Sequence, residues 1–253
     1  MEIRDKVAFV TGAGSGLGRA TALSLAAAGA RVAALDRDLK AAQRAVDQMA
    51  GQGMAVEIDV AEEESVADAM GAVTDAFGTV HICVNAAGIA PAGKVISRGR
   101  PLPLADFRRV IDINLIGLFD VVRRCAEHMA TNDPGPDGER GVFVNVSSGA
   151  AWQGQKGQAG YAASKAGVIG LTLPLARDLA DHGIRVVTIA PGIFETGMSA
   201  GFPETVRAAL KQLVLYPSRF GAPEEFAQLV NHIVTNRYLN ATTLSLDGGA
   251  RMI

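Results

Sequence analysis

Short apolar runs and longer amphipathic segments alternate along the whole chain. The runs are rich in β-branched residues and apolar at nearly every position, which is typical of strands buried on both faces of a parallel sheet. The segments between them carry apolar residues at helical spacing. The pattern predicts an α/β fold with a seven-stranded, parallel, doubly wound sheet covered by helices. The expected strands are Val7–Thr11, Arg31–Asp36, Met54–Asp59, Val80–Val84, Val142–Val146, Arg185–Ala190 and Thr242–Leu246.

Helical spacing is clearest in two of the intervening segments. Apolar positions recur at intervals of three and four from Val66 to Phe77, and again from Phe107 to Cys125. The segments Pro91–Pro103 and Asn132–Gly141 interrupt the rhythm and are rich in glycine, proline or charge, so we expect loops there. No linker or shift in composition divides the chain. We therefore expect one domain over residues 1–253.

Composition and charge narrow the classes of function. Hydrophobic residues make up 49% of the 253 residues and charged residues 20%, so apolar burial can offset the loss of chain entropy. The 24 basic and 26 acidic residues give a formal net charge of −2. A chain this close to neutral has no overall attraction for nucleic acid or for an anionic membrane. We expect a small-molecule partner, with no nucleic acid and no membrane.

The cysteine, histidine and N-terminal patterns narrow the possible classes of function further. Cys83 and Cys125 lie in apolar stretches without CxxC spacing, which indicates neither a disulfide framework nor a zinc site. The histidines show no ligand pairing, so we expect no metal. No uninterrupted apolar run reaches the ~18 residues typical of a membrane span. Charged residues stand directly before the first strand, where a targeting peptide would be apolar, and we expect a cytoplasmic location.

A glycine-rich turn follows the first strand. The segment Thr11-Gly12-Ala13-Gly14-Ser15-Gly16-Leu17-Gly18 joins that strand to a helix. At such a junction backbone N–H groups and a helix N-terminus can approach a pyrophosphate without hindrance from a Cβ. The strict GxGxxG spacing is absent, because Leu17 stands at the third glycine position. Taken alone, such a cluster is more typical of tight strand–helix packing than of a ligand site.

Asp36 favours a ligand site at the glycine turn over a turn that serves only for packing. It ends the second strand roughly 20 residues after the turn, where a carboxylate can accept hydrogen bonds from both hydroxyls of an adenosine ribose. The carboxylate would repel a 2′-phosphate, so we predict NAD rather than NADP; the opposing signal is Arg37, which could pair with that phosphate. Asp59-Val60 and Asn85-Ala86-Ala87-Gly88 end the next two strands and border the same crevice.

Tyr161 and Lys165 lie one helical turn apart, so their side chains share a face. A nearby ammonium favours the phenolate, and we expect the pKa of Tyr161 to lie below the ordinary value of ~10. Tyr161 would then be the general acid or base. Ser148, after the fifth strand, could hold the substrate oxygen, with Ser147 as the less suitable alternative. Asn114, a poor helix former inside a long helix, predicts a local bend with a water held toward Lys165.

Together these motifs resemble the short-chain dehydrogenase/reductase family, from Lys6 to the end of the chain. The likeness rests on the glycine turn, Asp59, Asn85–Gly88, Asn114, Ser148, Tyr161 with Lys165, and Pro191-Gly192. It implies a single Rossmann domain with a catalytic tetrad of Asn114, Ser148, Tyr161 and Lys165. The cofactor contacts that it implies are Gly12, Ser15, Gly16, Leu17, Gly18, Asp36, Asp59, Val60, Asn85, Ala86, Gly88, Tyr161, Lys165, Pro191, Gly192, Phe194 and Thr196.

Within this family the sequence is most similar to the short-chain 3-hydroxyacyl-CoA dehydrogenases, also described as 17β-hydroxysteroid dehydrogenases, which use NAD. The likeness is carried by Pro91–Phe107, Asn132–Gly141, Gly154–Gln158, Thr172–Ala180 and Leu246–Gly248. Two residues depart from the family pattern: Ala86 replaces a usual asparagine, and Glu195 replaces a smaller residue. The resemblance also implies a homotetramer, formed through apolar helices such as Leu104–Met129 and Tyr161–Asp181.

The sequence indicates less clearly which residues bind the substrate. Residues 194–216 carry apolar positions at helical spacing and could form either a lid over an acyl chain or steroid, or an ordinary packing helix. Gln155 could line the pocket together with Ser148 and Tyr161. The basic residues of the Pro91–Pro103 segment could meet the phosphates of coenzyme A: Lys94, Arg98 and Arg100.

The expected reaction is the reversible oxidation of a secondary alcohol, most consistent with a 3-hydroxyacyl-CoA that becomes a 3-oxoacyl-CoA. Two alternatives remain open. One is a related enzyme that acts on a steroid, a sugar or a carrier-bound 3-oxoacyl group. The other is a non-catalytic dinucleotide-binding module, which would have no need of Tyr161 and Lys165 together.

Overall fold

A parallel seven-stranded sheet forms the centre of the molecule. The structure is a computed structural model that describes residues 1–51, 53–197, 201 and 203–251. The strand order is β3-β2-β1-β4-β7-β8-β9, and all pairings in this sheet are parallel. All the expected strands are present, and β1, β2 and β9 have the predicted bounds. The strands are β1 (Val7–Thr11), β2 (Arg31–Asp36), β3 (Gly53–Glu57), β4 (Ile82–Asn85), β7 (Gly141–Val146), β8 (Ile184–Pro191) and β9 (Thr242–Leu246).

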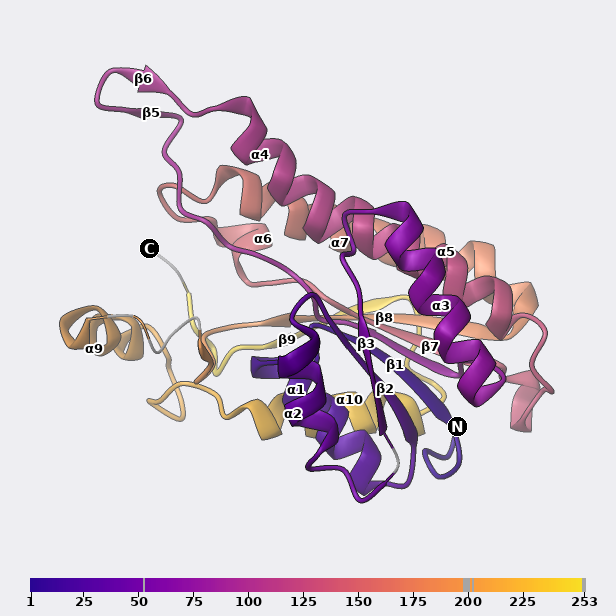
Figure 1. Cartoon of the computed structure of the whole chain (residues 1–253). Coiled ribbons are helices and arrows are strands. Elements are labelled where there is room, and N and C mark those ends of the chain that lie inside the picture. The colour runs from indigo at the N-terminus through magenta and orange to yellow at the C-terminus, as the bar shows by residue number, and fades with distance from the viewer. Residues whose placement is uncertain (52, 198–200, 202, 252–253) are drawn as a thin grey trace.

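Helices cover both faces of this sheet (Figure 1). Phe9 and Phe143 are buried under the helices of one face, and their neighbours Val10 and Val144 under those of the other. Because successive residues of a strand point to opposite faces, double covering explains why the strands are apolar at nearly every position. One layer is α3 (Glu63–Phe77), α5 (Gly117–Met129) and α7 (Ala159–Leu179); the other is α1 (Gly16–Ala27), α2 (Leu39–Val46) and α10 (Pro223–Thr235).

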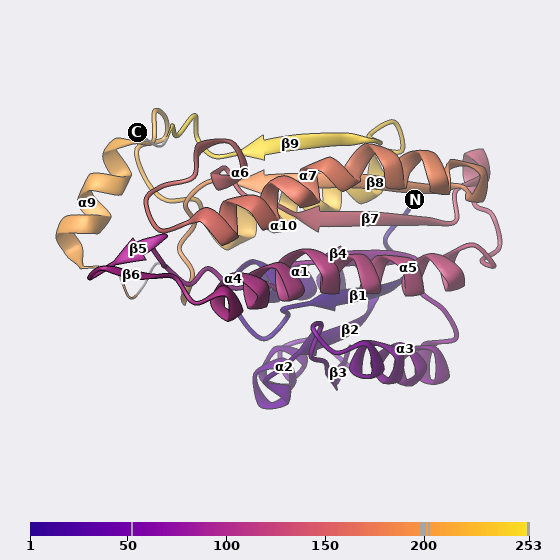
Figure 2. The same ribbon diagram turned by 90° about the horizontal axis from the view of Figure 1, so that it is seen from above.

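Several shorter elements gather beyond the carboxyl edge of the sheet, toward which the strand arrows point in Figure 2. They are α4 (Leu104–Ile111), α6 (Ala150–Gln153), α9 (Glu204–Gln212) and the hairpin of β5 (Ile96–Ser97) with β6 (Arg100–Pro101). The hairpin lies in the segment Pro91–Pro103, where we expected only a loop. Arg98 and Gly99 have φ of 51° and 72°, as a tight two-residue hairpin turn requires.

The long helix expected over Leu104–Met129 is interrupted by a π-helical turn, η1 (Asp112–Ile116). Asn114, at the centre of this turn, is fully buried, so the helix is irregular at the residue where a local bend was predicted. Gly117, the first residue of α5, packs directly on the chain after β3. A Cβ at this position would lie only 2.3 Å from Val60 O.

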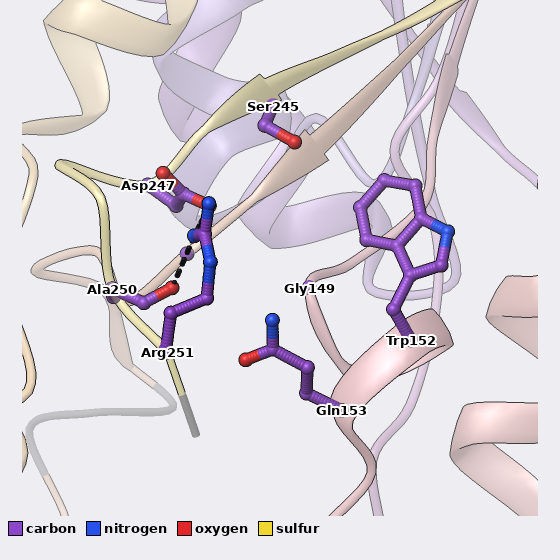
Figure 3. A pocket seen from close by; sticks show the side chains of 8 residues that line it. Gly149, Trp152, Gln153, Ser245, Asp247, Ala250 and Arg251 are labelled. Carbon is purple, nitrogen blue, oxygen red and sulfur yellow. Dashed lines mark hydrogen bonds and ion pairs between the residues drawn. The ribbon is translucent and has the colours of Figure 1, made fainter. Parts of the chain in front are cut away.

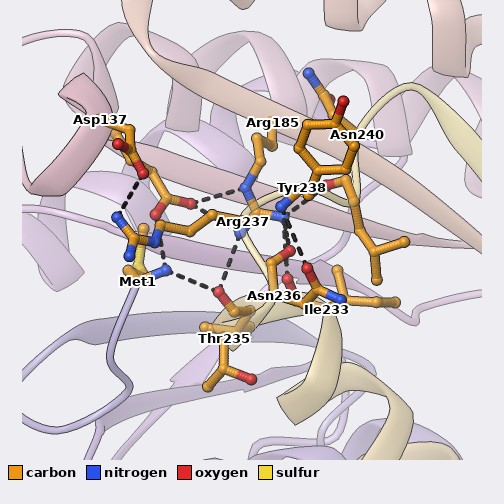
Figure 4. Close-up of polar contacts among 12 residues, drawn as sticks. Met1, Asp137, Arg185, Ile233, Thr235, Asn236, Arg237, Tyr238 and Asn240 are labelled. Atoms are coloured by element: carbon orange, nitrogen blue, oxygen red, sulfur yellow. Dashed lines mark hydrogen bonds and ion pairs between the residues drawn. The ribbon is translucent and has the colours of Figure 1, made fainter.

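A buried ion network closes the opposite, amino edge of the sheet (Figure 4). Glu139 pairs with the α-ammonium of Met1 at 2.7 Å and with Arg185 at 2.7 Å. Arg185 also donates to the carbonyl oxygens of Ile233 and Val234, each at 3.0 Å. The last carbonyls of a helix have no partner within the helix, so these bonds fasten the end of α10 to β8.

Cys83 and Cys125 are free and buried. Within the described ranges, no helix combines the length and apolarity needed to cross a bilayer.

Candidate active site

The glycine turn has the geometry needed for close approach by a ligand. Gly12 and Gly16 have φ of 67° and 51°, in the left-handed region that favours glycine. A Cβ at Gly18 would lie 2.2 Å from Gly12 O, so the turn closes only with glycine there. Ser15 precedes α1 and its side chain makes no capping bond to the helix. Because α1 follows the carboxyl end of β1, its N-terminus lies at the carboxyl edge of the sheet. An anion is stabilised at such a helix N-terminus.

Asp36 lies against this turn. Its Oδ2 accepts the N–H of Gly14 at 2.9 Å, and its Oδ1 accepts that of Asp38 at 3.0 Å. A Cβ at Gly14 would lie 2.8 Å from Asp36 Oδ2, so glycine permits the close contact. The carboxylate is held by backbone donors at the end of β2, while the neighbouring Arg37 is exposed. This position suits a carboxylate that accepts ribose hydroxyls.

The ends of β3 and β4 complete this half of the site. The carboxylate of Asp59 accepts the N–H of Ala61 at 3.0 Å, and Val60 is buried. The side chain of Asn85 points into the sheet, where Nδ2 donates to Asn145 Oδ1 at 2.9 Å. A cofactor contact at Asn85 would therefore come from its backbone.

Sequence reasoning missed the polar row to which Asn85 belongs. Thr11, Asn85 and Asn145 are partners in neighbouring strands, each at or near the end of its strand. Thr11 Oγ1 accepts the N–H of Ala87 at 3.2 Å, which fixes the segment that contains Ala86 and Gly88. The available signal was a polar residue at the same register in adjacent apolar strands.

Tyr161, Ser148 and Lys165 meet where β7 ends beside α7. The phenol of Tyr161 hydrogen-bonds to Ser148. Lys165 Nζ donates to Val146 O at 2.7 Å and lies 5.9 Å from the centroid of the Tyr161 ring. Ser147 Oγ donates to Lys165 O at 2.8 Å, so the alternative serine fastens β7 to α7. The structure thus brings together three of the predicted catalytic side chains and favours Ser148 over Ser147.

The pKa of Tyr161 differs from the prediction. Burial raises it above the ordinary value, and the hydrogen bond with Ser148 opposes this rise. The predicted lowering by Lys165 is wrong for this arrangement, because the ammonium is directed to Val146 O and desolvation of the phenolate dominates. Burial also lowers the pKa of Lys165 to about 8. Lys165 consequently loses its proton at a lower pH than Tyr161 does.

Asn114 connects α7 with the segment after β4. Its Oδ1 accepts the N–H of Ile89 at 2.9 Å, and its Nδ2 donates to Ile89 O at 2.9 Å and to Ser164 Oγ at 3.1 Å. A Cβ at Gly88 would lie 3.2 Å from Asn114 Oδ1 and 3.5 Å from Lys165 Nζ. Backbone at Gly88 therefore passes directly beside both polar groups. Ser164 is a buried partner that no sequence motif singled out.

The segment after β8 reaches the glycine turn. Gly192 N–H donates to Leu246 O at 2.9 Å, and Pro191 O accepts a backbone N–H at 3.0 Å. A Cβ at Gly16 would lie 3.4 Å from the methyl carbon of Thr196, which places Thr196 beside the turn. Phe194 is buried and packs edge-on against Phe226 at 6.2 Å, so its side chain belongs to the core.

A cavity of about 250 Å³ opens beside Gly149 and Gly192, which follow β7 and β8 (Figure 3). Its walls include the indole of Trp152 on one side and Arg251, paired with Asp247 at 3.2 Å, on the other. Gln155 is exposed at the same end of the molecule. The described residues contain no group of three or more metal-binding side chains. The lining residues are Gly149, Trp152, Gln153, Gly192, Ser245, Asp247, Ala250 and Arg251.

The fold and this site define a dehydrogenase that uses a nicotinamide dinucleotide. The chain matches the family model of the short chain dehydrogenases over residues 6–207, and it belongs to that family. The resemblance inferred from the sequence motifs is confirmed.

Individual relatives sharpen this assignment. The chain is 45% identical to a 3-hydroxyacyl-CoA dehydrogenase type-2 of Drosophila melanogaster over 99% of both proteins. A Homo sapiens protein of the same name is 44% identical, over 99% of this chain and 97% of that protein. The crystal structure of 3-hydroxyacyl-CoA dehydrogenase type-2 from Mycobacterium avium is similar with a TM-score of 0.93, 36% identity, and coverage of 98% of this chain and 96% of that one. A 3-oxoacyl-acyl-carrier-protein reductase of Thermotoga maritima is 34% identical, over 98% of this chain and 99% of that protein.

Proposed function

We propose that this enzyme reversibly oxidises the hydroxyl group of a 3-hydroxyacyl-CoA to give a 3-oxoacyl-CoA, with NAD as its cofactor. The observation that carries the proposal is the meeting of Tyr161, Ser148 and Lys165 at the same edge of the sheet as the glycine turn. Relatives 44% and 45% identical over almost the whole chain are named as 3-hydroxyacyl-CoA dehydrogenases, which supports this substrate class.

The residues present fit a nicotinamide dinucleotide. The N-terminus of α1, with Gly12, Ser15, Gly16, Leu17 and Gly18, offers backbone N–H groups to a pyrophosphate. Asp36 would accept the adenosine ribose hydroxyls and repel a 2′-phosphate, which favours NAD. Asp59 and Val60 would border the adenine. The nicotinamide half would contact Asn85, Ala86 and Gly88 through backbone, together with Pro191, Gly192, Phe194 and Thr196. When bound, the dinucleotide supplies the site that accepts or returns the hydride.

Tyr161 exchanges the proton of the substrate hydroxyl. Its raised pKa makes the neutral phenol the resting form, which suits donation to a carbonyl oxygen in the direction of reduction. Ser148 holds the same oxygen, as its contact with the phenol indicates. Lys165 would hold the nicotinamide ribose, and it keeps its charge only below about pH 8. Asn114 maintains the proton route beside Lys165.

The substrate would lie between three elements at the carboxyl edge. None of the residues of α9 is buried, which favours a lid over an ordinary packing helix for residues 194–216. Residues 198–200 and 202 of this predicted lid lie outside the described part of the chain. Gln155 would line the pocket beside Ser148. The exposed basic side chains of the segment Pro91–Pro103 would meet the phosphates of coenzyme A: Lys94, Arg98 and Arg100.

We also propose one domain over residues 1–253, a homotetramer and a cytoplasmic location. Apolar side chains on the outer faces of the helices support the assembly, because Ile116, Phe119 and Leu173 are 55%, 43% and 43% exposed in the single chain. Light scattering tests this part of the proposal. A monomer at micromolar concentration would contradict it.

A paired substrate and cofactor screen tests the activity. The panel contains 3-hydroxybutyryl-CoA, longer 3-hydroxyacyl-CoA substrates, a steroid alcohol and a carrier-bound 3-oxoacyl group, each with NAD and with NADP. We expect kcat/KM to be highest for a 3-hydroxyacyl-CoA with NAD. In Asp36→Asn, the preference for NAD over NADP should fall by about tenfold or more, because the repulsion of the 2′-phosphate is removed.

The same screen separates the alternatives. A preference for the carrier-bound group with NADPH would favour a reductase like the relative of Thermotoga maritima and would refute the assigned role of Asp36. Tight NAD binding without turnover of any alcohol would favour a non-catalytic module.

A further inference from the structure

We propose that Glu195 and Arg207 are positioning residues that couple the cofactor-binding segment after β8 to helix α9. Binding of the dinucleotide would then hold α9 in place over the substrate. The inference rests on the proposed function, in which Thr196 contacts the dinucleotide and α9 is part of the lid.

An ion pair joins the two segments. Arg207 Nη2 donates to Glu195 Oε1 at 2.8 Å and to Oε2 at 2.9 Å. The guanidinium of Arg207 also lies 5.0 Å from the ring centroid of Phe220, and Lys211 Nζ lies 5.9 Å from the same ring. Phe220 is only 2% exposed, so it offers a fixed aromatic base. Helix α9 is therefore docked through one row of cationic side chains.

Apolar packing contributes little to the position of α9. None of its residues is buried, and the side chain of Val206 is 41% exposed. Helix α10, by contrast, buries Phe226, Val230 and Ile233 under the sheet. An element with few buried contacts separates from the protein at low free-energy cost. Buried Val214 holds the chain directly after α9, and the ion pair with Glu195 can consequently decide where the first turns of the helix lie.

On the other side of the ion pair, the backbone of Glu195 is bonded to Gly221. Glu195 N–H donates to Gly221 O at 2.9 Å, and Gly221 N–H donates to Ile193 O at 2.9 Å. The same bridge pairs Phe194 with Gly221. Thr196, directly after Glu195, lies beside the glycine turn. A ligand that fixes Thr196 therefore fixes the carboxylate that holds Arg207.

Hydrogen exchange of the segment 203–212 tests this coupling. We expect saturating NADH to slow exchange in the unmodified enzyme. Without NADH, Glu195→Gln should exchange about two- to fivefold faster than the unmodified enzyme, as expected for loss of one surface ion pair. NADH should no longer slow exchange in this variant, although NADH fluorescence still reports binding. Raising the salt concentration should reproduce the faster exchange in the unmodified enzyme, because salt screens exposed charges.

Two further variants serve as comparisons. Arg237→Gln removes another ion pair at the surface, with Asp137 at 2.6 Å, and should leave α9 and its response to NADH unchanged. Arg207→Lys keeps the charge and should retain part of the coupling. In steady-state assays, Glu195→Gln should raise the KM for the alcohol about two- to fivefold and leave kcat within about twofold.

Either of two results would overturn the coupling. In one, NADH slows exchange of α9 equally in Glu195→Gln and in the unmodified enzyme. In the other, NADH has no effect on α9 in the unmodified enzyme. The exchange experiment contains no alcohol, so a failure of the proposed acyl-CoA activity would appear separately in the substrate screen.

Discussion

The two edges of the sheet each bury a cation, and its surroundings differ. At the amino edge Arg185 is 7% exposed, pairs with Glu139 at 2.7 Å and donates to carbonyl oxygens of α10. At the carboxyl edge Lys165 is 5% exposed and donates to Val146 O, and within the described residues it forms no ion pair. Desolvation without a counter-ion accordingly lowers the pKa of Lys165 to about 8.

The difference in surroundings predicts that the cation at the amino edge contributes to stability and the cation at the carboxyl edge to chemistry. A buried charge with a full set of partners holds elements together, and removal of one partner leaves the other uncompensated. A buried charge without a counter-ion destabilises the fold, and such groups are concentrated at catalytic sites. We therefore expect substitutions at the amino edge to lower the free energy of unfolding without loss of turnover, and those at the carboxyl edge to lower turnover without loss of stability.

Substitution of Tyr161 by Phe should give the largest effect. It should impair the site at the carboxyl edge and leave the amino edge unchanged. We expect kcat to fall by about 10³-fold, because a positioned general acid or base contributes about 10²- to 10⁴-fold. The absorbance of NADH measures turnover. The melting temperature and the affinity for NADH should stay close to those of the unmodified enzyme. Residual activity within tenfold of the original would exclude the assigned role.

Glu139→Gln should have the opposite profile. It leaves Arg185 and the ammonium of Met1 beside a neutral amide, and loss of one partner from a buried ion network costs about 3–5 kcal/mol. For a chain of this size the melting temperature should fall by roughly 6–20 °C. The kcat of the folded enzyme at 25 °C should change less than about twofold.

Asp137→Asn is the matched control for that experiment. It removes the exposed ion pair with Arg237 on the same side of the molecule, and such pairs contribute about 0–1 kcal/mol. Equal losses of stability in Asp137→Asn and Glu139→Gln would argue against a special role for the buried network.

Lys165→Met should reduce turnover and stabilise the fold. Below pH 8 the buried ammonium is charged in both states, and the difference between a pKa of 10.5 and one of about 8 corresponds to about 3 kcal/mol of destabilisation. Loss of the hydrogen bond to Val146 O subtracts about 1 kcal/mol, so the net gain at neutral pH is about 2 kcal/mol. Urea unfolding at several pH values measures it.

The direction in which the stability gain of Lys165→Met changes with pH tests this explanation. The folded-state pKa of Lys165 is depressed, so the penalty is full below about pH 8 and disappears as the pH rises to 10.5. The advantage of Lys165→Met should shrink over this interval. A gain that is constant with pH would show that packing, rather than the charge, is its cause.

His81→Asn should give the smallest effect and sharpen the picture of the amino edge. Burial, with Lys6 and Arg31 nearby, lowers the pKa of His81 to about 4, and its Nδ1 accepts the N–H of Val7 at 3.2 Å. Stability from this neutral ring is complete above pH 6.5 and is lost as the pH falls toward 4. Because the ring is partly solvated, we expect a loss of about 1 kcal/mol.

Asparagine keeps an acceptor for the N–H of Val7 and does not titrate. Urea unfolding between pH 7 and 4 should therefore show a flatter profile in His81→Asn than in the unmodified enzyme. Parallel profiles for the two proteins would assign the acid sensitivity to other groups.

The strands and the shared helix face of Tyr161 and Lys165 were predictable because their signals are local. Burial on both faces leaves continuous apolar runs, and one helical turn brings Tyr161 and Lys165 to the same face. The helix propensity of Asn114 indicated an irregularity, although it did not specify a π-helical turn. These features depend on neighbouring residues in the chain.

The features that the sequence did not predict depend on contacts between distant segments of the chain. The sequence places Lys165 near Tyr161, but the direction of its ammonium is set by Val146 on another element, and the degree of burial by the whole packing. The sign of the shift in the pKa of Tyr161 was consequently wrong. The pairing of Glu139 with Arg185 likewise joins residues that no short motif connects.

The π-helical turn at Asp112–Ile116 carries one residue more than a regular turn would need. Deletion of a single residue there would convert the region to one straight α-helix, and α4 and α5 could keep their places against the sheet. The shortened protein should therefore retain its scaffold but lose the clasp of Asn114 on Ile89 and Ser164. We therefore expect removal of one residue from this turn to give a dehydrogenase that folds but has lower turnover.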